Sequence, residues 1–135
     1  MQRPPCGWND ERGSVVLGIA AVGVAVVLVA AVGSVGAGIT AYAKAAAGAD
    51  AAALAAAPVT FRPFGATGSP RSEAAAFAAA NGSRLILCRC PVNRSWVSRS
   101  VDVTVARTLS ILGIGEVTVR ASSRATFDPS KLLDP

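Results

Sequence analysis

The feature that most constrains this chain is an uncharged, apolar run that extends from Gly13 to Ala43. A helix needs about 20 residues to cross the hydrocarbon core of a bilayer, and this run is longer and contains no proline. We therefore predict that residues 15–41 span a membrane. Amphipathic aromatic rings and cations favour the membrane interfaces, and they lie on both sides of this predicted span: Trp8 with Arg12, and Tyr42 with Lys44.

A cleaved secretory signal is the alternative interpretation of the same run. The triplet Ala41-Tyr42-Ala43 has the small-x-small pattern of a signal peptidase site ahead of Lys44. Signal sequences use an apolar region of about 7 to 15 residues, which is much shorter than this run and favours the anchor. Cleavage after Ala43 would release a small, secreted, basic binding protein.

Small residues recur at four-residue spacing within the predicted span. They are Ala21 and Ala25, followed by Ala30, Ser34 and Gly38. This spacing places them on one side of a helix, where a second membrane helix could approach closely. Such spacings also arise by chance in a segment rich in Ala and Gly, so a packing face at Ala30, Ser34 and Gly38 is one of two interpretations.

Alanine, the best helix former, occupies almost every position between Tyr42 and Pro58. Ser14 is suited to cap the start of the helix, and Pro58 is suited to stop it. A helix over residues 14–57 would be roughly 64 Å long at 1.5 Å per residue, twice the thickness of the hydrocarbon core. Its second half should project from the membrane as a stem, packed against another helix or against its own small domain.

The remaining residues predict a small α+β domain. Residues 58–71 read as a linker, Ser69 and Pro70 as the start of a short helix, and Asn81 with Gly82 as its end. Apolar and polar residues alternate in extended segments, and residues 128–135 form a tail. We predict a long transmembrane and stem helix, then one short helix on a three-stranded antiparallel sheet within residues 72–127. The predicted strands are 84–90, about 96–107, and 116–127.

Cys88 and Cys90 alternate onto one face of the first predicted strand. The chain has no histidine and no second cysteine pair, so a zinc site within one chain is not expected. Two residues apart on a strand, the Cα atoms lie near the upper limit for a disulfide. Small buried residues are therefore the favoured interpretation, and a disulfide between Cys88 and Cys90 or with another chain comes second. Cys6 lies on the other side of the predicted span and cannot pair with them.

The sequence predicts no active site. Catalytic carboxylates usually occur in pairs, whereas those here are scattered along the chain, and there is no histidine and no glycine-rich phosphate loop. We therefore expect no enzyme activity, no cofactor, no metal and no small-molecule substrate. The full +5 excess of charge follows the span. This excess includes a group of arginines around Trp96. The favoured interpretation is that they lie on solvated strand faces, and the alternative is that they bind an anionic envelope polymer. Nucleic acid is not an expected partner. The group comprises Arg84, Arg89, Arg94, Arg99 and Arg107.

The order of segments resembles that of the TadE/TadG-like pilus-assembly proteins of bacteria. The resemblance covers residues 11–127 and is carried by "ERGS", the Ala/Val/Gly span, "AKAAAGADAAALAAAP", "AAFAAANGSRLILC" and "VDVTVAR". The branch that it resembles most is the short TadE-like proteins found beside secretion and helicase genes. The resemblance implies a pilin-like fold with residues 1–13 as a cytoplasmic leader, one membrane span, and the small domain outside the membrane.

The resemblance further implies a non-catalytic, pseudopilin-like or accessory role in a tight-adherence (Flp/Tad) pilus or a type II/IV-related secretion apparatus. Its expected partners are membrane lipid and other TadE/TadG-like or pilus and secretion proteins. By analogy with prepilins, Gly13 before Ser14 is a candidate processing point. Prepilins usually carry a glutamate five residues after the cut, where this chain has Gly18, so processing and entry into a filament both stay open.

Overall fold

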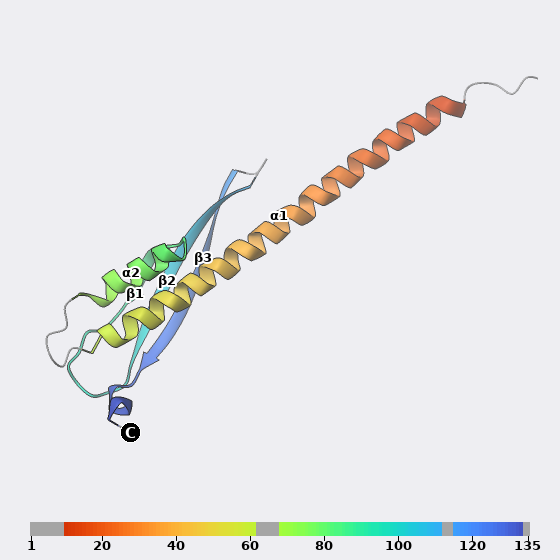
Figure 1. Ribbon diagram of the computed structural model, residues 1–135. Helices are drawn as coiled ribbons and strands as arrows, with labels where there is room; N and C mark the ends of the chain where they lie inside the picture. Colours follow the sequence, from red (N-terminus) through yellow and green to blue (C-terminus); the bar gives the residue numbers. More distant parts are fainter. Residues whose placement is uncertain (1–9, 62–67, 112–114, 134–135) are drawn as a thin grey trace, which may run out of the picture. The chain divides into compact units, whose positions relative to one another are not determined.

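The computed structural model describes residues 10–61, 68–111 and 115–133 (Figure 1). A long helix, a short helix and a three-stranded antiparallel sheet confirm the predicted α+β fold. The chain divides into two compact units, residues 1–36 and residues 37–135, and α1 contributes to both. The elements are α1 (Asp10–Val59), α2 (Pro70–Ala80), β1 (Arg84–Arg89), β2 (Arg99–Ile111), β3 (Gly115–Phe127) and the 3₁₀ helix η1 (Pro129–Leu132).

The first unit is the N-terminal part of α1. The helix begins at Asp10, four residues before the predicted start, and every residue from Val15 to Gly33 is exposed. Exposed valine, leucine and isoleucine side chains surround this part of the helix, so water would be a poor solvent for it. Within the described residues, α1 is the one helix long and apolar enough to cross a membrane.

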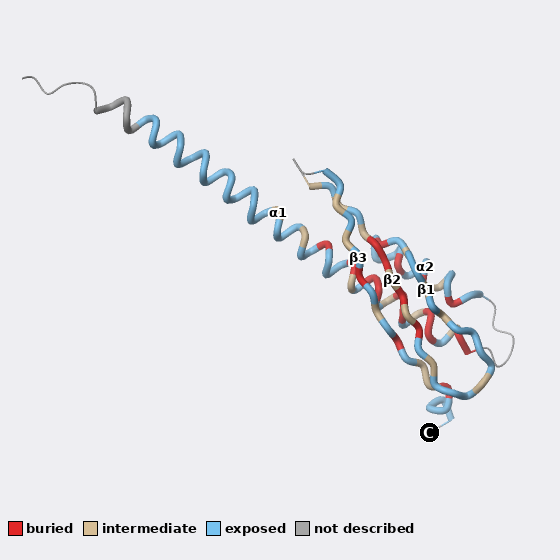
Figure 2. The backbone as a smooth tube through the Cα atoms, turned by 180° about the vertical axis from the view of Figure 1, so that it is seen from behind, coloured by how far each residue is buried: buried red, intermediate tan, exposed pale blue. Residues whose placement is uncertain are grey.

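In the second unit, the C-terminal part of α1 buries a face made almost only of alanine. Its fully buried residues recur at spacings of three and four, which places them on one side of the helix. They pack against Val101, Val103 and Val105 of β2 and against two alanines of α2, so the stem belongs to the core of its own small domain, which is one of the two predicted alternatives (Figure 2). The stem alanines of this core are Ala45, Ala49, Ala52, Ala53, Ala56 and Ala57.

The sheet has the order β1-β2-β3, with antiparallel neighbours. β2 and β3 pair without a shift from Arg99 opposite Phe127 to Ile111 opposite Gly115. β2 therefore starts a few residues later than predicted and continues further, because its pairing follows β3 over the full length of that strand. The predicted alternation of β3 is confirmed, since Ala121 and Ala125 face the core while the residues between them are exposed or half-buried.

The short helix α2 begins and ends where the sequence predicts. Ser69 caps its start in a reciprocal capping box with Ser72, and Pro70 is its first residue. At its end, Gly82 takes a φ of +65° that only glycine adopts without strain. Ala74 and Ala78 face the core, whereas Phe77, the only large apolar side chain of α2, is 46% exposed.

Candidate functional site

The first candidate site is the small-residue strip on α1. The Ser34 hydroxyl donates to the carbonyl oxygen of Ala30 at 2.8 Å, so this polar group is satisfied within the helix and can enter lipid. A methyl group added at Gly38 would meet no side chain within 4 Å, and Ala30 is exposed. The strip is therefore open for close approach by another helix, and the packing face at Ala30, Ser34 and Gly38 stays a prediction.

The candidate processing point lies inside a helix. Gly13 and Ser14 belong to the first turns of α1, whereas residues 1–9 of the predicted leader lie outside the described residues. Cleavage between Gly13 and Ser14 would require these turns to unwind. This processing also stays a prediction.

The cysteine pair is joined by a disulfide between Cys88 and Cys90, whose Cα atoms are 5.5 Å apart. Our favoured interpretation of two free buried cysteines is therefore wrong, and the bridge ranked second is formed. The physical reason is that β1 ends at Arg89, so Cys90 leaves the extended geometry that would hold the two Cα atoms further apart. Both cysteines are half-buried against the hydrophobic core, which makes the bridge part of the fold.

Arg99 lies at the centre of a network that joins the loop after β1 to the end of α1. Its guanidinium donates to the carbonyl oxygens of Thr60 at 3.2 Å and Asn93 at 2.6 Å. It also donates to the carbonyl oxygens of Ser95 and Val97 and lies over the ring of Phe61. The guanidinium group of Arg99 is thus engaged by groups within the domain, and its hydrogen bonds hold the loop after β1 in place.

Arg107 has a similar internal role at the other end of the domain. Its Nη1 atom donates to the carbonyl oxygens of Asn81 and Gly82, both at 3.0 Å, and so fastens the end of α2 to β2. Of the five arginines grouped in the sequence, only Arg84, Arg89 and Arg94 are exposed. The structure therefore does not bring the five together into one basic surface.

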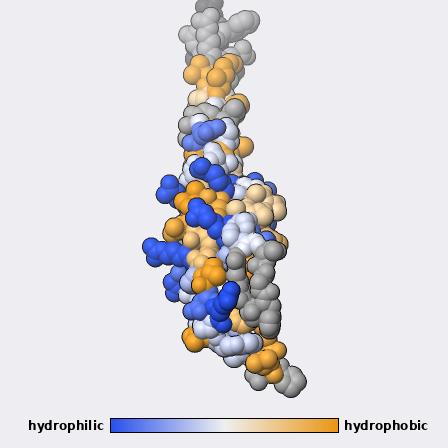
Figure 3. Space-filling model, turned by 90° about the vertical axis from the view of Figure 1, so that its left-hand side faces the viewer, coloured by the Kyte–Doolittle hydropathy of each residue, from blue (hydrophilic) through white to orange (hydrophobic). Residues whose placement is uncertain are grey.

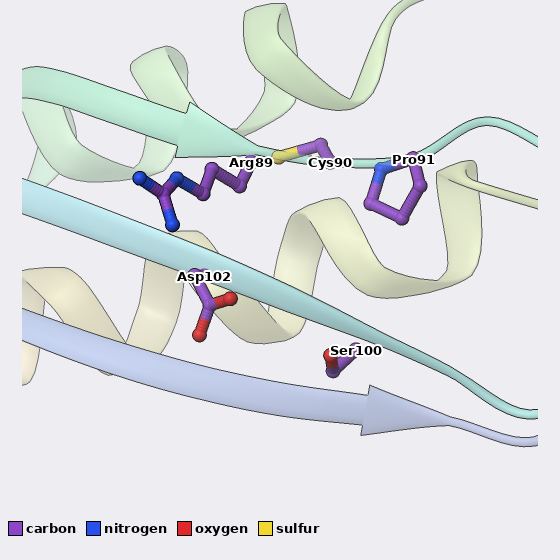
Figure 4. Close-up of a pocket in the computed structure, with 5 residues that line it drawn as sticks. All are labelled: Arg89, Cys90, Pro91, Ser100 and Asp102. Carbon is purple, nitrogen blue, oxygen red and sulfur yellow. The ribbon is translucent and has the colours of Figure 1, made fainter.

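The face of the sheet away from the helices is open and polar (Figure 4). Asp102 forms an ion pair with Arg124, and the hydrogen bond from Arg124 lowers the pKa of Asp102 below its ordinary value. Hydroxyl pairs continue this polar ladder, with Thr104 and Ser122 at 2.9 Å and Thr108 and Thr118 at 3.2 Å. Figure 3 shows hydrophilic side chains standing out from the surface of the small domain between hydrophobic ones.

A shallow hollow of about 490 Å³ lies where β1 ends beside β2. β1 pairs with β2 only as far as Arg89 opposite Asp102, so the start of β2 has no neighbouring strand on that side among the described residues. The hollow is wide open, and its carboxylate, that of Asp102, forms an ion pair with Arg124. Its lining residues are Arg89, Cys90, Pro91, Ser100 and Asp102 (Figure 4).

Two further observations bear on what these surfaces can do. Among the described residues, no group of three or more cysteine, aspartate or glutamate side chains could hold a metal ion. No family model, no curated protein and no solved structure matches the chain.

Proposed function

We propose that this protein is a non-catalytic, single-pass membrane component that holds a small α+β domain at a bacterial surface apparatus. The apparatus we favour is a tight-adherence pilus or a related secretion system, in which the protein would act as a pseudopilin-like or accessory subunit. The observation that supports this most directly is α1 itself, which is exposed and apolar in one unit and forms the core of the small domain in the other.

The environment of the side chains changes along α1. The exposed valines and leucines of the first unit need a lipid environment, because in water they would form a large apolar surface. The alanines of the second unit are already covered by the sheet and need no lipid. A helix of this kind could anchor the protein with its first part and hold the small domain with its second part. The proposed role needs no catalytic residue, cofactor, small molecule or nucleic acid.

Membrane fractionation tests the anchor. We expect the intact chain to remain with the membrane after washing with alkaline carbonate and to dissolve only in detergent. Mass spectrometry of the extracted chain should give a start at Met1, or at Ser14 if the leader is removed. A chain that alkaline carbonate extracts would contradict the proposal.

The proposed orientation places the N-terminus in the cytoplasm and the domain outside. Cys6 provides a natural probe, because Cys88 and Cys90 are bridged and do not react with maleimide. We expect Cys6 in intact cells to react with a membrane-permeant maleimide and to resist an impermeant one. Protection of Cys6 should disappear when the cells are permeabilised, and labelling of intact cells by the impermeant reagent would reverse the orientation.

One observation keeps the secreted alternative open to test. All members of the hydrophobic core cluster lie at Ala45 or beyond, so cleavage after Ala43 would leave the core of the domain intact. In this case a soluble basic protein starting at Lys44 should accumulate in the medium. Determination of the N-terminus of the mature protein separates the two functions.

Cross-linking tests partner association along the strip on α1. We expect a Gly38→Cys variant to form a disulfide with a neighbouring membrane helix carrying a matching cysteine, whereas Ile39→Cys, one residue along the helix, should not. The pair distinguishes a specific face from random collisions in the bilayer. Equal cross-linking at both positions would contradict a defined packing face.

A further inference from the structure

The two edges of the sheet are built differently. β1 has six residues, an irregularity between Leu85 and Leu87, and Pro91 shortly after its end. These are features that prevent further strands from pairing at an edge. β3 has 13 residues, pairs with β2 without a shift, and contains no proline.

β3 pairs only with β2 among the described strands, so its outer edge presents unpaired backbone N–H and C=O groups at alternate residues. In Figure 2 β3 forms one margin of the sheet. We propose that this edge binds an extended segment of another protein, in which acidic side chains alternate with apolar ones. The segment would add a fourth strand to the sheet, with backbone hydrogen bonds supplying affinity and the side chains of β3 supplying selectivity.

We expect the partner segment to be acidic because Arg120 and Arg124 lie on the open face of β3 and are exposed. Arg124 is engaged by Asp102, whereas Arg120 lies opposite Ala106 and forms no ion pair with any described residue. A carboxylate on a neighbouring strand would stand beside Arg120 at the distance of a cross-strand pair. Glu116, the single acidic residue of β3, leaves the strand with a net positive charge.

We expect the alternate side chains of the partner segment to be apolar because of the opposite face of β3. Val117 and Val119 are only half-buried there, so apolar side chains of an added strand would extend the cover over them. A second copy of β3 fits this edge less well, because it brings only one acidic residue, Glu116, to a strand that presents two arginines, Arg120 and Arg124. The proposed partner is therefore a different protein segment, independent of whether the domain is anchored or secreted.

The test uses the full chain in detergent micelles and a fluorescent ten-residue peptide of alternating Glu and Val, with binding measured by anisotropy at low salt. A second peptide of equal charge carries proline at two central valine positions, which removes backbone donors. We expect the first peptide to bind at least about tenfold more tightly than the second, because only the first can complete the strand pairing.

Two matched variants distinguish the edge from the face. Arg84 and Arg120 flank the same residue, Ala106, from β1 and from β3, and both are exposed. Arg120→Glu should weaken binding of the alternating peptide by about threefold to tenfold, and Arg84→Glu should leave it unchanged. Circular dichroism should show the same fold for both variants, and amide exchange should slow in β3 but not in β1 when the peptide binds.

Three results would overturn the proposal. Equal binding of the proline peptide would mean that charge alone attracts the peptide. Equal weakening by Arg84→Glu and Arg120→Glu would place the site on the sheet face. Slowed exchange in β3 that depends on protein concentration, without peptide, would assign the edge to a second copy of the chain.

Discussion

The two parts of α1 differ in their residues and in how far their side chains are buried. Between Val15 and Gly33 the side chains are exposed on all sides and include many valines, whereas from Ala45 to Ala57 one face is fully buried. Helix propensity is high in the second part and lower in the first, where β-branched residues dominate. The difference shows that bulky apolar residues occupy the part of α1 whose side chains are exposed, and that alanine occupies the part that packs against the sheet.

The largest expected effect on folding comes from removing the second part of α1, and removal of the first part is the control. A chain starting at Lys44 should fold and unfold cooperatively, because every member of the core cluster is retained. A chain starting at Thr60 should lack cooperative unfolding, since the sheet and α2 lose the alanines that cover them. Thermal unfolding followed by circular dichroism tests this, and equal melting of the two chains would show that the stem is dispensable for the core.

A charge placed on the buried face should come next in size. Ala53→Asp would put an unpaired carboxylate into the core and should lower the free energy of unfolding by about 3–5 kcal/mol. Leu54→Asp is the matched control, because Leu54 is adjacent and 68% exposed. Urea unfolding of both variants gives the comparison, and similar losses would mean that the buried face is assigned to the wrong side of α1.

Glycine substitutions probe how closely the second part of α1 approaches its neighbours. A Cβ atom at Gly48 would lie 3.1 Å from the Ser83 hydroxyl oxygen, whereas one at Gly23 would meet nothing within 4 Å. Gly48→Ala should therefore raise the free energy of unfolding by much less than the roughly 1 kcal/mol by which alanine stabilises a helix relative to glycine. In a Ser83→Ala background the gain should reappear, and strict additivity of the two substitutions would contradict the close approach.

The smallest effect is expected on the open face of the sheet. The lowered pKa of Asp102 means that its pairing with Arg124 adds stability above the ordinary value of 3.8, and this contribution is lost as pH falls through the lowered pKa. The pair is exposed to solvent, so Asp102→Asn should scarcely change the melting temperature at pH 7. A clear drop at pH 7 would show that this face, and not only the alanine face, stabilises the domain.

The sequence predicts those features that depend on local patterns. The alternation of β3, the capping residues Ser69 and Gly82, and the continuation of the helix past Tyr42 could all be read from neighbouring residues. The buried side of the stem could not be read, because a segment of nearly uniform alanine has no hydrophobic face for periodicity to reveal.

The internal roles of Arg99 and Arg107 also escaped prediction. Their acceptors are backbone carbonyls, which every residue carries, and two of them belong to Thr60 and Asn81, far away in the sequence. No side-chain pattern marks such pairings, so the sequence does not distinguish these two arginines from the exposed ones. The disulfide was ranked second for a related reason, since it depends on where β1 ends.

The alanine interface between stem and sheet also sets the calorimetric behaviour of the domain. Methyl groups remove little apolar area from water compared with leucine or phenylalanine side chains, so unfolding should produce a small rise in heat capacity for a domain of this length. A small heat-capacity change flattens the curve of stability against temperature. The domain should consequently keep much of its modest stability in the cold, where proteins with larger cores weaken.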